Sequence, residues 1–255
     1  MGHDKLRKFA ENATFSCLLQ PSADEVLAQG YRNLTDHPVK GHWSEKMFGG
    51  REAPLVLELG CGKGEYTIDL SMRCPESNYV GVDIKGARLW KGAKYATEHN
   101  LPNVAFLRTR IEFITAYFAP GEVSEIWLTF SDPQMTSENS RLTSPLFLER
   151  YRRMLRPGGV VHLKTDSRFL HEYTKAVVAA NGLEVLACTD DLYGDEKRLM
   201  RPELYEVQTF YEKMFLAQGL NITYMSFRID RDGSFVYPEF DAVSWRAAEK
   251  SRLQK

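Results

Sequence analysis

The sequence predicts an α/β fold with a doubly wound, mostly parallel sheet of seven strands, of which the last is antiparallel. From residue 54 onward, short apolar segments alternate with amphipathic ones. Continuous apolar runs are typical of parallel strands that are buried on both faces, and helices between them are typical of crossover connections. A chain of 255 residues with 43% hydrophobic side chains is long enough to bury such a core.

Each predicted strand is a short run rich in aliphatic and aromatic residues. In chain order these runs are 54–60, 78–84, 104–109, 124–130, 160–166, 183–189 and 221–229. The predicted helices lie between them, at 63–74, 86–100, 111–121, 144–159, 167–182 and 206–219. Pro-Gly pairs are expected to stop the third and fourth of these helices.

The sequence also carries information on domain organisation, cellular location, and metal or disulfide sites. Residues 1–53 lack the alternation, so we expect a partly mobile N-terminal arm packed against one domain, 54–255. No apolar run is long enough to span a bilayer, and the first residues lack the apolar segment of a signal peptide, which predicts a cytoplasmic protein without a membrane partner. The four cysteines are scattered without a Cys-x-x-Cys pair, so neither a metal site nor a disulfide framework is expected.

The first motif is "LELGCGKGEY", which places Glu58 before Gly60, Gly62 and Gly64 at a strand-to-helix turn. Glycines there allow positive φ and close approach of a ligand to the backbone. A dinucleotide site would show G-x-G-x-x-G, whereas the spacing here is G-x-G-x-G. The pattern therefore favours S-adenosylmethionine, which carries no phosphate, over a generic glycine turn.

Asp83 ends the second predicted strand, 25 residues after Glu58. A carboxylate at this position can accept both hydroxyls of a ribose, and the simpler interpretation is a strand-end cap. Two features at the carboxyl ends of adjacent strands favour the ligand role, because open α/β sheets bind ligands at that edge.

The fourth strand ends in "FSDP", which makes Asp132 our main substrate residue. The simpler interpretation is an aspartate that starts a turn before proline. The fifth strand ends in "HLKTD" and places Lys164, Thr165 and Asp166 on the same rim.

These motifs together resemble those of bacterial tRNA (guanine-N7-)-methyltransferases over nearly the whole chain. They are "LELGCGKGEY", "YVGVDIK", "LTFSDP", "RLTSPLFLERYRRMLRPGG", "HLKTD" and "TFYEKMF". The resemblance implies a Rossmann-like class I methyltransferase fold, S-adenosylmethionine as methyl donor, and methylation of guanine N7 at position 46 in the tRNA variable loop. It also implies cofactor contacts by the three acids Glu58, Asp83 and Asp132, a catalytic role for Asp132, and substrate contacts by Asp166, Thr209, Phe210, Tyr211 and Glu212. We expect a monomer or homodimer without a metal or an obligate protein partner.

Two departures from the family pattern concern binding. Arg110 stands 27 residues past Asp83, where the family has an acid or its amide, so Glu112 is a candidate for the adenine contact beside it. Thr136 stands four residues after Asp132, where the family has a lysine, and Arg141 is the only basic residue from 131 to 143. We count Thr136 and Arg141 among the substrate contacts and expect further phosphate contacts from Lys5, Arg7, Lys8, Arg150, Arg152 or Arg153.

Alternatives from other classes stay open at this point. A small-molecule or protein methyltransferase would use the same fold, and the net charge of −1 is compatible with one. A tRNA-binding relative with reduced activity would also fit, because of Arg110 and Thr136. The glycine spacing argues against a dinucleotide oxidoreductase.

Overall fold

A computed structural model of the chain describes residues 3–253, and side chains from residue 6 to residue 252. The chain divides into two compact units, Met1–Ile126 with Arg153–Arg156 and Trp127–Arg152 with Pro157–Lys255. The predicted domain boundary at residue 53 stays a prediction. Within the described part, no helix has the length and apolar character needed to cross a membrane.

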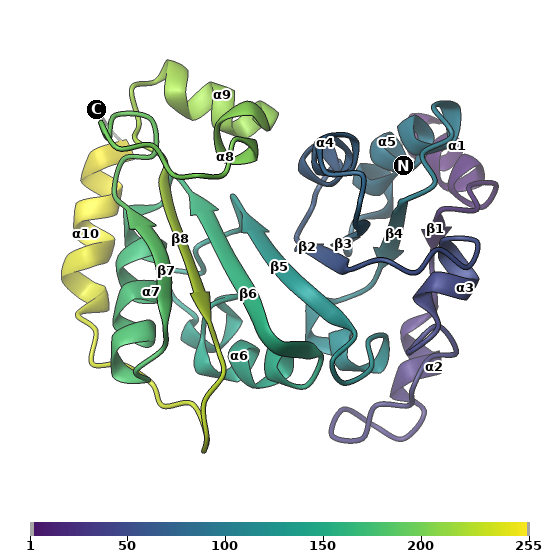
Figure 1. Ribbon diagram of the computed structural model, residues 1–255, viewed down its shortest axis with the longest axis horizontal. Helices are drawn as coiled ribbons and strands as arrows, with labels where there is room; N and C mark the ends of the chain where they lie inside the picture. The colour runs from purple at the N-terminus through teal and green to yellow at the C-terminus, as the bar shows by residue number, and fades with distance from the viewer. Residues whose placement is uncertain (1–2, 254–255) are drawn as a thin grey trace. The chain divides into compact units, whose positions relative to one another are not determined.

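The first unit contains parallel strands in the order β1-β4-β3-β2 (Figure 1). The register pairs Glu58 with Gly81 and Asp83 with Arg108, so the ends of β2, β3 and β4 lie at one edge. A core that includes Phe106 and Leu89 joins the strands to the helices. The bounds are β1 Leu18–Leu19, β2 Leu55–Leu59, α4 Glu65–Arg73, β3 Asn78–Asp83, α5 Gly86–Glu98, β4 Val104–Arg108 and η1 Ile111–Ala116.

The N-terminal stretch forms three helices that the hydrophobic pattern did not predict: α1 His3–Asn12, α2 Ala23–Leu27 and α3 Trp43–Met47. The Asn12 side chain donates to Gly86 O at 2.9 Å, which ties α1 to the start of α5. The Trp43 indole donates to Tyr117 O at 2.9 Å and stacks on Phe118. The N-terminal stretch is therefore packed into the first unit.

The second unit contains β6, β8 and β7 in that order, with antiparallel pairs that confirm the predicted antiparallel last strand. α7 packs against β8, and α10 packs against α7 (Figure 1). β5 and β6 each begin in the first unit and end in the second. The bounds are β5 Val123–Thr129, η2 Glu138–Ser140, α6 Pro145–Arg152, β6 Leu155–Thr165, α7 Arg168–Ala180, β7 Val185–Thr189, α8 Glu203–Glu206, α9 Phe210–Ala217, β8 Thr223–Arg228 and α10 Ala242–Leu253.

All seven predicted strands are present, β1 is an eighth strand that was not predicted, and three predicted helices differ from the structure. The helix predicted over 206–219 is divided, because α8 ends at Glu206 and α9 begins only at Phe210. The stretch 111–121 forms only a 3₁₀ helix over Ile111–Ala116. The helix predicted over 144–159 ends at Arg152, and β6 already begins at Leu155. Proline is tolerated at the beginning of a strand, and Gly158, with φ of 74°, lets the chain continue into β6.

Candidate active site

The turn after β2 has the conformation that its glycines predict. Gly60, Gly62 and Gly64 have φ values of 82°, 58° and 72°. A Cβ atom on Gly60 or Gly62 would meet nothing within 4 Å, so their backbone faces open space. A Cβ atom on Gly64 would lie 2.5 Å from the ring of Phe106. Two glycines therefore leave room for a ligand, and the third allows α4 to pack closely on the core.

Glu58 lies on β2 and is only 4% exposed. Its Oε2 accepts a hydrogen bond from Thr67 N at 2.9 Å and another from the Thr67 hydroxyl. These bonds fix the carboxylate to the first turns of α4, directly after the glycine turn. Glu58 thus brings negative charge to the edge where the cofactor is expected.

Asp83 ends β3 beside the same turn. Its Oδ2 accepts from Gly62 N at 3.0 Å, and its Oδ1 accepts from Lys85 N at 2.7 Å. An ionised carboxylate has about four lone-pair sites, so these two bonds leave acceptor capacity for two ribose hydroxyls. A fixed carboxylate next to an open glycine backbone fits the nucleoside part of S-adenosylmethionine.

Arg110 and Glu112 follow β4 in the first unit and pair with each other. Arg110 Nη2 lies 3.0 Å from Glu112 Oε1, and its guanidinium lies over the ring of Phe113. Arg110 therefore forms an ion pair with Glu112, the residue predicted to contact the adenine. The adenine contact itself stays a prediction.

Asp132 belongs to the second unit and lies on an exposed loop after β5. Its Oδ1 accepts from Gln134 N at 2.9 Å. Phe130 and Gln134, on either side of it, have φ values of 50° and 46°. Positive φ is unfavourable for a bulky side chain, and such strain gathers at functional sites. Phe130 N donates to Lys164 O at 2.9 Å, so the strained segment is anchored to β6.

Arg141 is 3% exposed and shapes the loop that carries Thr136. Its guanidinium lies 4.8 Å from the ring centre of Phe169 and 4.3 Å from that of Tyr173. It donates to the carbonyls of Gln134 and Met135, each at 3.2 Å. Thr136 itself is exposed. Arg141 is therefore a buried residue that stabilises the loop through its carbonyl groups. Its contact with tRNA stays a prediction.

Asp166 follows β6, and its side chain is 16% exposed. Burial raises the pKa of Asp166 to about 6, and the cation of Arg252, at 3.8 Å, opposes that rise. Arg252 lies in the last turn of α10, so the C-terminal helix contributes to the charge environment of this predicted substrate residue.

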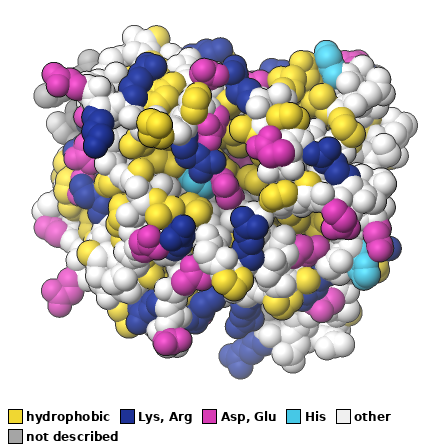
Figure 2. Space-filling view, in the orientation of Figure 1, with side chains coloured by type: hydrophobic (Ala, Val, Ile, Leu, Met, Phe, Trp, Pro, Cys, Tyr) yellow, Lys and Arg dark blue, Asp and Glu magenta, His cyan; other side chains and the backbone are white. Residues whose placement is uncertain are grey.

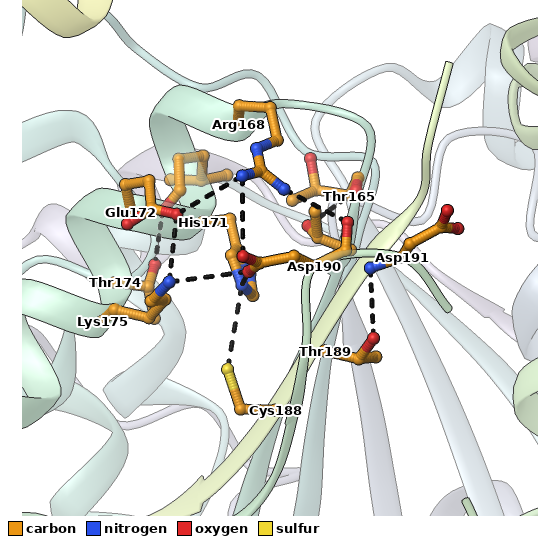
Figure 3. A network of polar contacts seen from close by, with 12 residues as sticks. Thr165, Arg168, His171, Glu172, Thr174, Lys175, Cys188, Thr189, Asp190 and Asp191 are labelled. Atoms are coloured by element: carbon orange, nitrogen blue, oxygen red, sulfur yellow. Dashed lines mark hydrogen bonds and ion pairs between the residues drawn. The ribbon is translucent and has the colours of Figure 1, made fainter. Parts of the chain in front are cut away.

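A polar network near Thr165, the last residue of β6, joins α7 to the residues after β7 (Figure 3). Asp190 contacts His171 Nε2 at 3.0 Å and Arg168 Nη2 at 3.5 Å. Burial lowers the pKa of His171 and raises the pKa of the Cys188 thiol. Nε2 of His171 faces both Asp190 and Cys188, whereas activation of a nucleophile needs the carboxylate on the other ring nitrogen. The network is therefore structural.

The segment Thr209–Glu212 divides into two structural and two exposed residues. The Thr209 hydroxyl accepts from Glu212 N at 3.1 Å and caps α9. Glu212 is fully buried and pairs with Lys164, also fully buried, at 2.7 Å. Phe210 and Tyr211 are 58% and 47% exposed. Only these two aromatic side chains of the segment present large surfaces to a substrate.

Lys164 is the residue whose position the sequence did not predict. It was expected on the rim, but its ammonium group is buried and donates to Leu204 O at 2.7 Å and Val207 O at 3.1 Å. Burial lowers its pKa, and the charge of Glu212 opposes that change. Side chains alternate between the two faces of a strand, so Lys164 lies on the face of β6 opposite to Leu163 and Thr165. This alternation was the available sign that Lys164 and Thr165 would not share one surface.

Comparison with known proteins shows which sequences and folds the chain is similar to. A family model described as a putative methyltransferase matches residues 52–225. A tRNA (guanine-N(7)-)-methyltransferase of Bacteroides thetaiotaomicron is 44% identical over 100% of this chain and 99% of its own length. A protein of the same name from Porphyromonas gingivalis is 49% identical over 84% of this chain and 88% of its own length.

Among solved structures, the 16S rRNA methyltransferase KamB matches 75% of this chain and 95% of its own, with a TM-score of 0.55 and 16% identity. That likeness supports the class I methyltransferase fold and nothing finer. The structure brings Glu58, Asp83 and the glycine turn together in the first unit, which also contains Arg110 and Glu112. Asp132, predicted to contact the cofactor as well as the substrate, belongs to the second unit with Asp166 and the α9 segment. By the extent and level of its sequence similarity, the chain belongs to the tRNA (guanine-N(7)-)-methyltransferase family.

Proposed function

We propose that this protein transfers the methyl group of S-adenosylmethionine to N7 of a guanine at position 46, in the variable loop of tRNA. The observation that carries the proposal is the Asp83 carboxylate, fixed by Gly62 N and Lys85 N beside an open glycine turn. Family membership supplies the substrate, because relatives that cover nearly the whole chain carry the name of this activity.

The first unit would hold the cofactor. S-adenosylmethionine supplies an electrophilic methyl group on a sulfonium centre. The backbone of Gly60 and Gly62 leaves space for it, Asp83 would accept the ribose hydroxyls, and Glu58 provides negative charge for the cationic end. Gly64 and Thr67 act indirectly, because they fix the turn and the Glu58 carboxylate.

The second unit would orient the guanine. N7 carries a lone pair, so its attack on a methyl group requires no general base. Alignment of the reacting atoms can lower the barrier by roughly 7–11 kcal/mol. Asp132 would accept the guanine N1–H and N2–H groups, and its charge would favour the positive purine that forms. The strained backbone on either side of Asp132 supports a preorganised role.

A guanine within folded tRNA has to leave its stack, which costs a few kcal/mol. Phe210 and Tyr211 offer exposed rings on which a base can stack. The ring of Tyr211 contacts that of Phe215, which in turn contacts Phe130, two residues before Asp132. Asp166 and Thr136 would make polar contacts to the same nucleotide or its neighbours. We further propose a cytoplasmic monomer or homodimer that acts without an obligate protein partner.

The test is incubation of the purified chain with labelled S-adenosylmethionine and unmodified tRNA, followed by nucleoside mass spectrometry. The expected product is 7-methylguanosine, and a guanine-46 substitution in the tRNA should abolish it. Asp132→Asn should lose most turnover at saturating tRNA while calorimetry with S-adenosylmethionine still shows binding. Transfer to metabolites or proteins but not to tRNA would assign the chain to another methyltransferase class, and tRNA binding without transfer would make it a non-catalytic relative.

A further inference from the structure

A basic surface lies on the two helices α1 and α5 of the first unit. In residues 6–12 and 84–98 the only acids are Glu11 and Glu98, against six basic residues: Arg7, Lys8, Lys85, Arg88, Lys91 and Lys94. The whole chain has 33 basic and 34 acidic residues, and on the face in Figure 2 both kinds are scattered among each other. The α1–α5 basic surface, defined by these six residues, is thus a local excess of positive charge.

The centre of the α1–α5 basic surface is Trp90, which is partly exposed. Arg7, Lys8 and Lys94 place their charged groups 5.1, 5.0 and 5.2 Å from the centre of its indole ring. The indole N–H donates to Glu11 Oε2 at 2.7 Å, and Arg7 binds the same carboxylate at 2.6 Å. Glu11 therefore orients the indole ring and one of its cations.

The surface begins at the edge where the cofactor is expected. Lys85 N binds Asp83, and α5 begins at the next residue. Lys91 pairs at 3.0 Å with Glu65, the first residue of α4 after the glycine turn. Cations on this surface therefore border both features that would hold S-adenosylmethionine in the first unit.

On the α1–α5 basic surface, Arg7, Lys91 and Lys94 pair with Glu11, Glu65 and Glu98, and such exposed ion pairs are weak enough to exchange for phosphates. Other basic side chains expected to bind phosphate make backbone or ring contacts within the protein. Arg141 is buried against two rings and two carbonyls. Arg152 donates to Gly233 O at 2.5 Å and pairs with Glu149. Arg150 donates to Leu146 O at 3.2 Å and lies over Phe147. The side chain of Lys5 lies outside the described residues.

We propose that the α1–α5 basic surface binds the phosphate backbone of tRNA, with Trp90 lying against a ribose or base. The inference rests on the proposed function and adds to it the surface on which the substrate lies. Cations grouped around an aromatic ring are the usual combination for nucleic acid, in which phosphates give affinity and the ring gives a stacking surface. The position beside the cofactor edge favours the substrate RNA over an acidic protein.

The test neutralises the surface on each helix separately, with R7Q/K8Q on α1 and K91Q/K94Q on α5. The matched control is K40Q/K46Q. This control also removes two positive charges and one i,i+4 ion pair, that of Lys40 with Asp36. It lies away from the proposed surface, because Lys46 is on α3 and other α3 residues lie by the amino ends of β2 and β3. Binding of unmodified tRNA is measured over a series of salt concentrations, and calorimetry with S-adenosylmethionine checks the fold.

Each surface variant should weaken tRNA binding roughly tenfold at low salt, and the slope of log K against log salt should fall by about 0.7–0.9 for each lost phosphate contact. The control should bind like the wild type. Wild-type affinity and slope in both surface variants would overturn the proposal. If one pair misfolds, the pair on the other helix still decides. A wild type that binds tRNA through this surface but forms no 7-methylguanosine would refute the proposed function and leave the surface standing.

Discussion

Lys164 and Glu212 form an ion pair of 2.7 Å in which both side chains are fully buried. Lys164 also bonds the carbonyls of Leu204 and Val207, and Glu212 accepts from the Tyr193 hydroxyl at 2.7 Å. The pair therefore joins β6 to α9 and to the segment before it. Lys164→Met should cost about 3–5 kcal/mol in the free energy of unfolding, measured by urea denaturation, because it leaves a buried carboxylate without its partner.

The double variant K164M/E212L separates loss of charge pairing from loss of packing. It removes both charges and should recover most of the stability, since apolar replacements of a buried pair are often neutral or stabilising. A K164M protein as stable as the wild type would show that the pair does not hold α9. If the pair presents Phe210 and Tyr211, K164M should also raise KM for tRNA more than KM for S-adenosylmethionine.

Gly64 offers a second prediction, about the glycine turn. Gly64→Ala adds a Cβ atom 2.5 Å from the Phe106 ring at a φ of 72°, whereas Gly60→Ala adds strain without a clash. We expect G64A to lower the free energy of unfolding, measured by urea denaturation, more than G60A does, by a difference of about 1–3 kcal/mol. Phe106→Leu in the G64A background should restore part of the loss. Equal free energies of unfolding for G64A and G60A would contradict the close packing at this position.

Substitution of Gln134 tests whether the backbone beside Asp132 is strained. Its φ of 46° suits glycine, so Gln134→Gly should be neutral or stabilising by up to about 1 kcal/mol. Thr136→Gly in the same loop is the control and should destabilise, because the threonine has no positive φ to relieve. If the strain preorganises Asp132, Q134G should lower kcat while leaving S-adenosylmethionine affinity unchanged. A destabilising Q134G would argue that the left-handed turn carries no strain.

The alternation of strands and helices was predictable from sequence because parallel strands buried on both faces leave long apolar runs. β2, for example, is buried at every position. The helices α1, α2 and α3 were missed because they are short or polar and are held by tertiary contacts such as Trp43 to Tyr117. Such contacts join residues that are far apart in the chain and leave no local period.

The glycine turn and Asp83 were predictable as neighbours because strand ends in a parallel sheet share an edge. The roles within the α9 segment were not. A Thr-x-x-Glu sequence is compatible both with substrate contacts and with a helix cap, and only burial distinguishes Glu212 from Tyr211. The left-handed Phe130 was equally hidden, because an aromatic residue gives no sign of positive φ.

Asp166 predicts a pH dependence of stability. Burial raises the pKa of Asp166 to about 6, above its value in an unfolded chain, so the folded state holds the proton more tightly. The stabilising contribution is therefore complete below about pH 4 and is lost as the pH rises to about 6, amounting to at most roughly 3 kcal/mol. Urea denaturation from pH 4 to 7 should show this decline in the wild type and a flatter profile in Asp166→Asn. Arg252→Gln should shift the decline to higher pH, and identical profiles for all three proteins would contradict the assignment.

Tyr211 tests whether α9 presents rings to the substrate. The ring is 47% exposed and stacks on Phe215 with centroids 6.4 Å apart, so its outer face is available to a base. Tyr211→Ala should weaken tRNA binding by about 1–3 kcal/mol, because base stacking on an aromatic ring is worth that much. Tyr211→Phe keeps the ring and should bind like the wild type, which separates stacking from hydrogen bonding by the hydroxyl. Calorimetry with S-adenosylmethionine should be unchanged in both variants, since Glu58, Asp83 and the glycine turn lie in the other unit. Loss of tRNA affinity in Tyr211→Phe as large as in Tyr211→Ala would replace the stacking role by a polar one, and wild-type affinity in both would remove Tyr211 from the substrate surface.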